Sequence, residues 1–424
     1  MNEMSPSSQP RTPMSRKMSP GVEKAVKVQP DTEARTIRLL PDEPQRICVQ
    51  DFRQMLMTAV MSGASDITFQ SDQQPRPEIH GILYRGMTRP LSPTELNLVL
   101  VEAYGGSNGP TEINAMNVLD FSYELNLPDG DRQRFRVNAT GIYGRDGAGV
   151  ELTFRALPRR TPDLEMVKLG ADEVAALAPR DGIVVIAGAT GSGKSTTMAA
   201  LTRYHLEESP RPVKIVDIQA PIEYTFRDVM SSLGGSSSTI GQSEVGRHVR
   251  SFAEGVHSAL RRKPHIINVG EARDFETIAA SLEASLTGHL VYTTTHAGSV
   301  AVAIRRLLTI FPGNERESRG YDLVNALRFL MVQHLVPTPD GSGRVPVREY
   351  LQFTEAMRER LLTSPMQDWS TIVDQAVQGA LAGQDPEMQH ASLQSVCSKL
   401  YAEGKITRRD ALHLGGRYAV EGHG

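Results

Sequence analysis

The chain has 424 residues with 46 basic and 49 acidic side chains, and this balance argues against nucleic acid as its main ligand. Its two cysteines, Cys48 and Cys397, lie far apart in the sequence, which excludes a disulfide framework or a cysteine-pair zinc site and fits a reducing compartment. We find no apolar run of the ~20 residues that a membrane helix needs and no hydrophobic signal-peptide core. We therefore expect a soluble, intracellular protein with at least two domains.

Residues 1–46 are rich in Pro, Ser and Met and contain almost no aromatic side chain. Such a segment buries too little apolar surface to compensate for the loss of chain entropy. We predict a disordered N-terminal arm, which is either a solvated tail or a segment that folds on a partner.

Residues 47–158 have the pattern of an α+β domain. Apolar side chains at helical spacing from Phe52 to Val60 predict a helix that Gly63 ends, and Ser92, Pro93 and Glu95 predict the start of another. Alternating residues predict an antiparallel sheet with strands at 66–69, 121–125, 134–140 and 150–155 and a hairpin over 77–84. The Pro-containing segment 159–162 is predicted to be a hinge linker between domains.

From residue 163 to 365 the pattern changes to strands that alternate with helices. Apolar runs at 183–187, 213–218, 265–269 and 290–295 are separated by helical stretches, which predicts a parallel sheet in an α/β domain. The chain from about 315 is expected to be mostly helical. Residues 366–424 form a predicted C-terminal helical region, with a helical pair at 393–411.

A phosphate-binding P-loop follows the first of these strands and opens a helix, which is the context that supports the motif. Glycines let backbone N–H groups surround an anion, and the helix dipole adds positive potential there. We expect Lys194 to reach the β- and γ-phosphates and the Ser195 hydroxyl to ligate Mg²⁺, so ATP and Mg²⁺ are the predicted cofactors. The predicted nucleotide-binding residues are Gly188, Ala189, Thr190, Gly191, Ser192, Gly193, Lys194, Ser195 and Thr196.

Acidic residues follow two of the predicted strands. A P-loop needs a carboxylate at a strand end to hold the Mg²⁺ shell or orient water, and Glu271 is the candidate, with Mg²⁺ expected to bind it through water. Asp274 is the alternative acid, but it is better placed to cap the helix that follows. Glu223, after the second strand, is a candidate to activate the attacking water or is simply a surface acid.

Histidines and arginines give weaker signals. His289 and His296 flank the fourth predicted strand, where they are either sensors of the nucleotide or structural residues. Four arginines lie on or beside the strands of the first domain, and an arginine finger from outside the P-loop core accelerates many such ATPases. These candidates, whose alternative is an ordinary surface charge, are Arg134, Arg136, Arg145 and Arg155.

Together these motifs resemble the type II and type IV secretion ATPase superfamily, in particular the branch of the pilus retraction ATPase PilT and the type IVB secretion ATPase DotB. The TraJ conjugation ATPases of IncI-type plasmids are equally compatible. The resemblance covers about residues 45–415 and is carried by several stretches in one order. These are 63–66, 134–138, 188–196, 221–223, 268–274 and 288–296, with 242–248 and 260–264 more similar to DotB than to PilT.

The resemblance implies a homohexamer in which a PAS-like N-terminal domain packs against the RecA-like core of the neighbouring subunit. It implies Walker B, Asp-box and His-box roles for Glu271, the region 218–223, and His289 with His296. It also maps a helical motif loosely onto residues 356–361. The chain departs from the family in one place, because Gln219 and Ala220 stand where the Asp box has acid before the proline. A neutral amide orients water but cannot take its proton, so we expect slower turnover and faster hydrolysis in a Gln219→Glu variant.

The sequence thus predicts a hexameric ATPase that powers a type IVB secretion or conjugation apparatus from the cytoplasmic face of the inner membrane, held there by partner proteins. A pilus retraction motor and a nucleotide-gated assembly protein with little turnover stay open as alternatives. A nucleic-acid motor of RecA type is disfavoured because no basic stripe is present.

Overall fold

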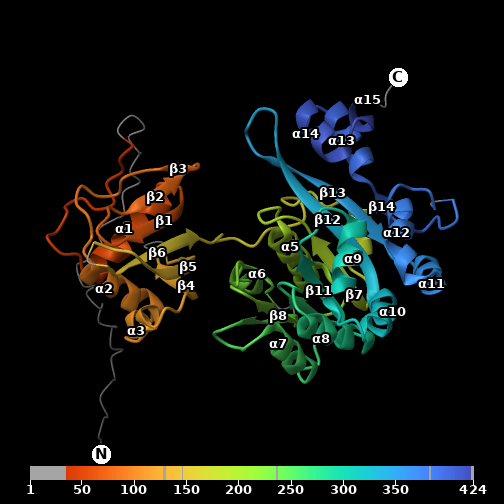
Figure 1. Cartoon of the computed structure of the whole chain (residues 1–424), viewed down its shortest axis with the longest axis horizontal. Coiled ribbons are helices and arrows are strands. Elements are labelled where there is room, and N and C mark those ends of the chain that lie inside the picture. The colour runs from red at the N-terminus through yellow and green to blue at the C-terminus, as the bar shows by residue number, and fades with distance from the viewer. Residues whose placement is uncertain (1–34, 128–129, 146, 235–236, 382, 422–424) are drawn as a thin grey trace, which may run out of the picture. The chain divides into compact units, whose positions relative to one another are not determined.

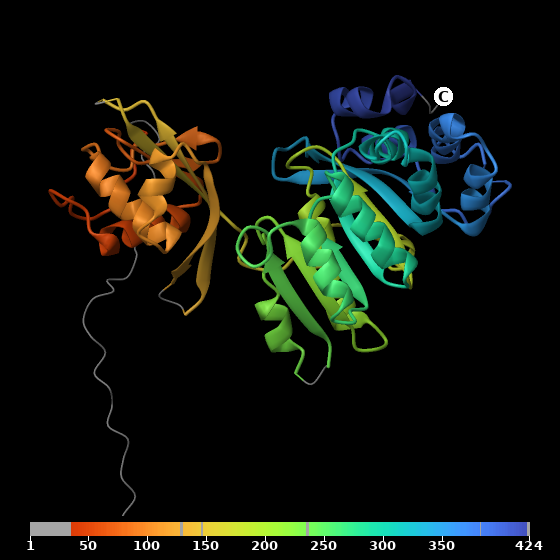
Figure 2. The same cartoon turned by 60° about the horizontal axis from the view of Figure 1, so that its bottom comes forward.

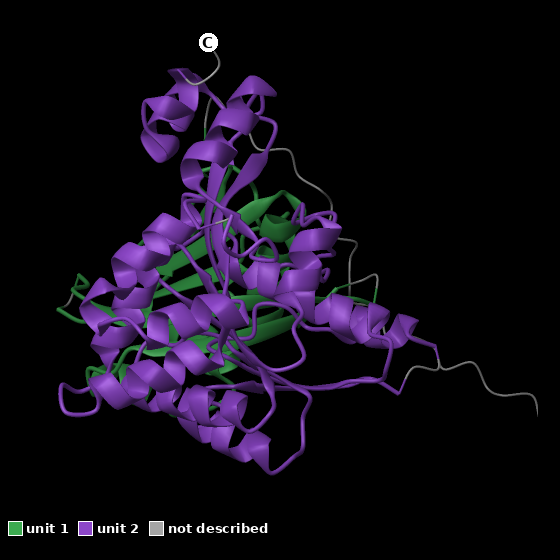
Figure 3. Ribbon diagram, turned by 90° about the vertical axis from the view of Figure 1, so that its right-hand side faces the viewer, with its two compact units in different colours: residues 1–156 green, residues 157–424 purple. Residues whose placement is uncertain are grey.

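The computed structural model describes residues 35–127, 130–145, 147–234, 237–381 and 383–421 (Figure 1). The chain divides into two compact units, residues 1–156 and 157–424, which Figure 3 colours separately. Each unit has a sheet and a hydrophobic core of its own. The fold-class prediction is confirmed, since an α+β unit precedes a unit built on a mainly parallel sheet.

The first unit is a six-stranded antiparallel sheet in the order β3-β2-β1-β6-β5-β4. Its helices are α1 (Val49–Met61), α2 (Pro93–Tyr104) and α3 (Gly109–Asn114). The strands are β1 (Ala64–Gln70), β2 (Arg76–Ile79), β3 (Ile82–Leu83), β4 (Leu119–Asn126), β5 (Arg132–Ile142) and β6 (Gly149–Ala156). The predicted helices and strands of this unit are therefore confirmed.

Aromatic side chains fill the core between this sheet and its helices. Phe52 of α1 lies 5.7 Å from Phe69 and 5.4 Å from Phe154 between ring centroids, and all three are fully buried. Such aromatic contacts add stability beyond the burial of apolar area. The predicted start of α2 is also confirmed, because Ser92 Oγ accepts from the Glu95 amide while Glu95 Oε2 accepts from the Ser92 amide.

The prediction of disorder up to residue 46 is wrong for residues 35–46. Ile37 and Leu39 are buried, and their amides donate to the carbonyls of Arg85 and Gly86 at 2.9 and 3.1 Å. Glu43 accepts from the Thr88 amide at 2.8 Å. Residues 37–40 are Ile, Arg, Leu and Leu, and the average composition of residues 1–46 does not reveal so short an apolar run. Residues 1–34 lie outside the described part of the chain.

The second unit is an eight-stranded sheet in the order β14-β13-β12-β7-β11-β10-β8-β9. Strands β12 to β9 in this order run parallel, whereas β13 and β14 are antiparallel to their neighbours. The strand bounds are β7 (Gly182–Ala187), β8 (Lys214–Gln219), β9 (Thr239–Glu244), β10 (Ile266–Val269), β11 (Leu290–Thr295), β12 (Leu327–Pro337), β13 (Arg344–Gln352) and β14 (His390–Ala391).

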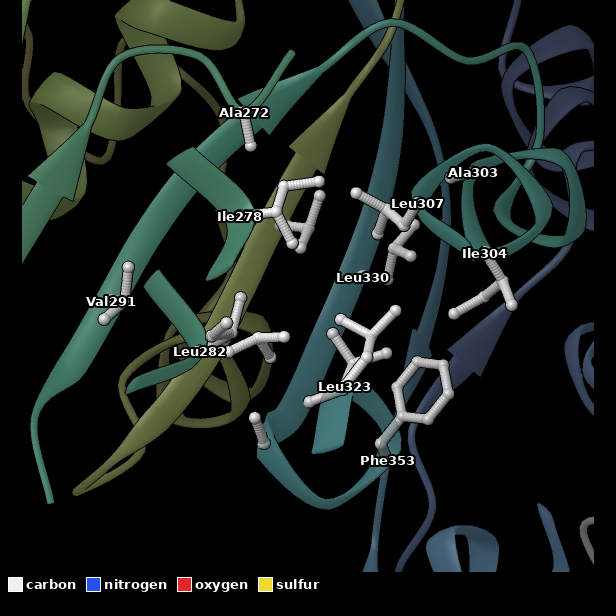
Figure 4. Packing of buried hydrophobic residues seen from close by; sticks show 14 of the residues in the cluster. Ala272, Ile278, Leu282, Val291, Ala303, Ile304, Leu307, Leu323, Leu330 and Phe353 are labelled. Atoms are coloured by element: carbon white, nitrogen blue, oxygen red, sulfur yellow. The ribbon is translucent and has the colours of Figure 1, made fainter. Parts of the chain in front are cut away.

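Helices cover both faces of this sheet, as Figures 1 and 2 show. On one face, α7 (Phe252–Leu260), α8 (Phe275–Leu286), α9 (Val300–Ile310) and α10 (Arg316–Ala326) enclose the larger core, and Ile278, Leu307 and Leu323 gather there around Leu330 of β12 (Figure 4). The other face carries α4 (Ala171–Leu177), α5 (Lys194–Glu208) and α6 (Arg227–Ser232). Asp274 caps α8 by accepting from the Thr277 amide at 2.8 Å, as predicted.

The expectation of a mostly helical chain after residue 315 is wrong for the hairpin of β12 and β13. The run at 327–337 is apolar on both faces, and such a run does not distinguish a strand from a buried helix. The remaining helices agree with the prediction. They are α11 (Glu355–Leu362), the 3₁₀ helix Met366–Asp368, α12 (Trp369–Val377), α13 (Leu393–Ala402), α14 (Arg408–Gly415) and α15 (Tyr418–Glu421). Among the described residues, no helix is both long enough and apolar enough to cross a bilayer.

Candidate nucleotide site

The P-loop joins the carboxyl end of β7 to the first turn of α5. Gly188 and Gly193 have φ values of +146° and +84°, which L side chains rarely adopt. A Cβ on Gly188 would collide with the backbone oxygen of Gln333, so the loop also needs glycine for space. The backbone turns tightly here and leaves the N-terminal amides of α5 available to an anion.

Lys194, the first residue of α5, folds back over this loop. Its Nζ donates to the carbonyl oxygens of Gly188 and Ala189, each at 2.9 Å. Burial lowers the pKa of Lys194, and the carboxylates of Glu271 and Glu223 act in the opposite direction. The ammonium group therefore lies within the electrostatic reach of both predicted acids.

Glu271 lies just beyond the end of β10, at the edge of the sheet where the P-loop leaves β7. One carboxylate oxygen is 3.5 Å from His296 Nε2, and the other is 3.8 Å from a guanidinium nitrogen of Arg273. Its side chain is 28% exposed. Glu271 and His296 thus form a pair beside the P-loop.

The segment after β8 forms the other side of the site. Ser195, Glu223 and Gln219 line one narrow cavity together with Asp217. The hydroxyl of Tyr224 is 3.0 Å from Thr196 Oγ1 and joins this segment to the P-loop helix. The site therefore contains an ammonium group, two carboxylates and a serine hydroxyl around a loop suited to phosphate.

These donors fit Mg²⁺ in a nucleotide complex. Magnesium usually takes one or two protein oxygens and completes its shell with water and substrate phosphates. The Ser195 hydroxyl, in the first turn of α5, and the Glu271 carboxylate, just after β10, are oxygen ligands that this site offers. The described residues contain no group of three or more His, Cys, Asp or Glu side chains that could hold a metal.

His289 is not brought to this site. It precedes β11, at the amino end of the strand, whereas His296 follows the carboxyl end beside Glu271. Its Nδ1 is 2.9 Å from the carbonyl oxygen of Ala284, and its own carbonyl accepts from the Gly182 amide. Within this chain, His289 therefore connects α8 to the amino end of β7, the end away from the P-loop.

The candidate arginines lie in the first unit. Arg134 and Arg136 alternate with the buried Phe135 on β5, and Arg136 pairs in register with Arg155 of β6, so these three share the outer face of the sheet. Arg155 Nε is 2.8 Å from Asp66 Oδ1. Arg134 is mostly buried and lies 3.8 Å from Glu124. Arg145 is exposed in the turn after β5.

The structure adds residues that the motif analysis missed. Gln333 of β12 lies beneath the P-loop, where Nε2 donates to the Ser192 carbonyl at 2.6 Å and Oε1 accepts from Thr197 Oγ1 at 2.9 Å. Arg348 of β13 donates to the same Oε1 at 2.9 Å and to the carbonyls of Val167 and Lys168. Burial lowers the pKa of Arg348 to about 10. Charged residues within the apolar run 345–351 are the signal that could have identified this network.

Known proteins with a similar sequence include the type IV pilus retraction ATPase PilT of Pseudomonas aeruginosa. It is 32% identical over 371 residues, which cover 85% of this chain and 97% of PilT. The twitching motility protein of Neisseria gonorrhoeae is 35% identical over 272 residues, or 64% of this chain and 68% of that protein.

Similar solved structures include the ATPase DotB of Legionella pneumophila. It is 38% identical to this chain, with a TM-score of 0.72, and the match covers 87% of this chain and 96% of DotB. The pilus retraction motor PilT with bound ADP is 29% identical, with a TM-score of 0.69 and coverage of 85% and 96%. The model of the type II/IV secretion system protein family matches residues 42–368. The chain therefore belongs to the type II/IV secretion system protein family.

Proposed function

We propose that this protein is a homohexameric ATPase that powers a type IVB secretion or conjugative transfer apparatus. The observation that carries the ATPase part of this proposal is the site itself, in which Lys194 lies within electrostatic reach of Glu271 and Glu223 at one P-loop. A family of secretion and retraction ATPases provides the context. ATP is the proposed substrate, and Mg²⁺ is the proposed metal cofactor.

In this mechanism the triphosphate displaces the carbonyl oxygens of residues 188 and 189 from Lys194, whose ammonium group then pairs with the β- and γ-phosphates. Ser195 and, through water, Glu271 would hold Mg²⁺, which would supply positive charge that neutralises the phosphates. Water attacks the γ-phosphorus, the bond to the β-phosphate oxygen breaks, and ADP leaves. Glu223 takes the proton of the water. His296, 3.5 Å from Glu271, stabilises the position of that carboxylate.

The choice of machine rests on similarity. The match to DotB over 87% of this chain supports secretion or conjugation. The match to PilT, whose name states pilus retraction, supports a retraction motor as the second candidate. In both cases we propose a cytoplasmic ring that reaches the inner membrane through partner proteins and binds no nucleic acid directly. Pilin genes or secretion-core genes beside the coding gene would distinguish the two machines.

Steady-state ATP hydrolysis by the ring fraction from size-exclusion chromatography tests the proposal. The wild type should turn over ATP, whereas Lys194→Ala and Glu271→Gln should each lower kcat by a factor of at least ~100. The Glu271→Gln variant should still bind ATP, because it keeps the P-loop. A wild-type ring that binds nucleotide but hydrolyses it no faster than the variants would instead support the nucleotide-gated assembly protein.

A further inference from the structure

Asp217 is a buried acid that the mechanism above does not use. It lies two residues before Gln219 on β8, so both side chains point to the same face of the sheet. Gln219 Nε2 donates to Asp217 Oδ1 at 2.7 Å, and Gln242 Nε2 of β9 donates to Oδ2 at 2.8 Å. Both carboxyl oxygens are therefore occupied by amide donors, and only 2% of the residue is exposed.

The orientation of these amides follows from the chemistry of the carboxyl group. Gln242 is fixed independently, because its Nε2 also donates to the Tyr224 carbonyl and its Oε1 accepts from the Phe226 amide. A carboxylate can only accept hydrogen bonds, so Gln219 must turn its NH₂ toward Asp217. Burial raises the pKa of Asp217, and the amide hydrogen bonds oppose this shift. The orientation holds as long as Asp217 Oδ1 carries no proton, because a hydroxyl there would donate to the Gln219 oxygen instead.

The amide oxygen of Gln219 consequently points the other way, to the end of β10. A Cβ built on Gly270 would lie 2.6 Å from Gln219 Oε1, so this oxygen lies directly over the residue that precedes Glu271. Gln219 also lines the cavity that contains Ser195 and Glu223. An amide oxygen in this place can accept a hydrogen bond from a water molecule and orient its attack on a γ-phosphate.

We propose that Asp217 is a positioning residue for hydrolysis, which holds the Gln219 carboxamide so that its oxygen, and not its nitrogen, faces the attacking water. Gln219 then orients the water while Glu223 takes the proton. This inference rests on the proposed ATPase function. It also changes the expectation for Gln219→Glu, because that substitution alone places two carboxyl groups at hydrogen-bond distance.

A reciprocal exchange of acid and amide tests the inference. In Asp217→Asn, the fixed NH₂ of Gln242 takes the oxygen of the new amide, so the NH₂ of residue 217 faces Gln219 and turns the Gln219 oxygen away from the water. The kcat should then fall ~10-fold or more with KM for ATP within about twofold of wild type. Gln219→Glu alone should lose at least as much. The double variant D217N/Q219E restores one donor against one acceptor, with the new amide at position 217 facing a carboxylate at position 219. It should recover kcat to within about threefold of wild type.

Glu349→Gln is the matched control, because Glu349 is a buried acid of β13 that accepts a hydrogen bond from the backbone amide of Val300 at the start of α9. Its kcat should stay within about twofold of wild type. Thermal unfolding of all variants shows whether each one folds. Loss of kcat in both single variants without recovery in the folded double variant would overturn the inference, as would wild-type turnover in Asp217→Asn. A wild-type ring without turnover would instead overturn the proposed function and remove the water-orienting role with it.

Discussion

At the scale of single residues, the position of the P-loop depends on one buried amide. Gln333 is 2% exposed and satisfies the Ser192 carbonyl, the Thr197 hydroxyl and the Arg348 guanidinium at once. Gln333→Met removes all three hydrogen bonds and leaves buried polar groups without partners, so we expect the free energy of unfolding to fall by about 1–3 kcal/mol. The affinity for ADP should fall as well, because the loop loses its anchor. Chemical denaturation and calorimetric titration with ADP measure the two effects.

Gln133 offers a matched control for this substitution. It is equally buried, at 2% exposure, but lies on β5 of the first unit, where its Nε2 donates to the Arg134 carbonyl. Gln133→Met should destabilise the protein without changing its affinity for ADP. If Gln333→Met also kept full affinity, the network beneath the P-loop would be structural only.

The sequence predicts those residues of the site that belong to a local motif, but not the distant residues that hold them in place. The P-loop has a fixed spacing and a local structure that follows from it, and the structure places Glu271 and Glu223 within electrostatic reach of Lys194. The side chain that holds the P-loop from below, Gln333, comes from β12, 141 residues beyond its partner Ser192, and Arg348 of β13 holds Gln333 in turn. No local pattern encodes such contacts. Asp217 did have a signal, since an acid within the apolar run 215–218 must find donors when it is buried.

At the scale of elements, α5 is joined to β11 by a buried histidine. His205 Nε2 lies 2.7 Å from the hydroxyl of Tyr292, which itself donates to the Leu177 carbonyl, so the hydroxyl accepts from His205. Burial lowers the pKa of His205 from 6.5 to about 4. The unfolded chain therefore binds the proton more readily than the folded one, and stability is lost as the pH falls from about 6.5 toward 4.

We expect this residue alone to cost about 2 kcal/mol of unfolding free energy between pH 8 and pH 5. His205→Gln keeps a donor for Tyr292 but does not titrate. Denaturant unfolding at both pH values should show a smaller loss for the variant than for the wild type. Burial lowers the pKa of His334 as well, but that contribution is common to both proteins and cancels in the comparison. Equal losses in the two proteins would contradict the assignment.

Elements with a clear period or cap were predictable, whereas those defined by distant pairing were not. Ser92 and Asp274 mark the starts of α2 and α8 through local hydrogen bonds that their sequence neighbours supply. Strand β9 carries the polar sequence of residues 239–244, and its place at the sheet edge follows from pairing with β8. The same holds for residues 35–46, whose ordering depends on residues 85–88.

At the scale of the whole molecule, the proposed ring would allow an active site shared between neighbouring subunits. The outer sheet face of the first unit carries Arg134, Arg136 and Arg155, and Arg145 is exposed in the turn beside it. The opposite face is filled by the aromatic core. A guanidinium from a neighbouring subunit that reaches the γ-phosphate would be worth about 10³–10⁵ in kcat. One arginine variant among the four should therefore lose turnover while it keeps ATP binding.

Mixing two inactive proteins tests whether that arginine acts in trans. In rings assembled from Lys194→Ala subunits and the inactive arginine variant, some interfaces combine an intact P-loop with an intact arginine from the neighbour. At equal mixing, turnover should recover to about one quarter of the wild-type value. About half of the subunits carry an intact P-loop and about half carry an intact arginine, so both meet at about one interface in four. If the arginine acts on the P-loop of its own chain, the mixed rings should stay inactive, because neither protein carries both an intact P-loop and an intact arginine. Recovery on mixing, absent when either protein is measured alone, would thus establish a site built by two neighbouring chains.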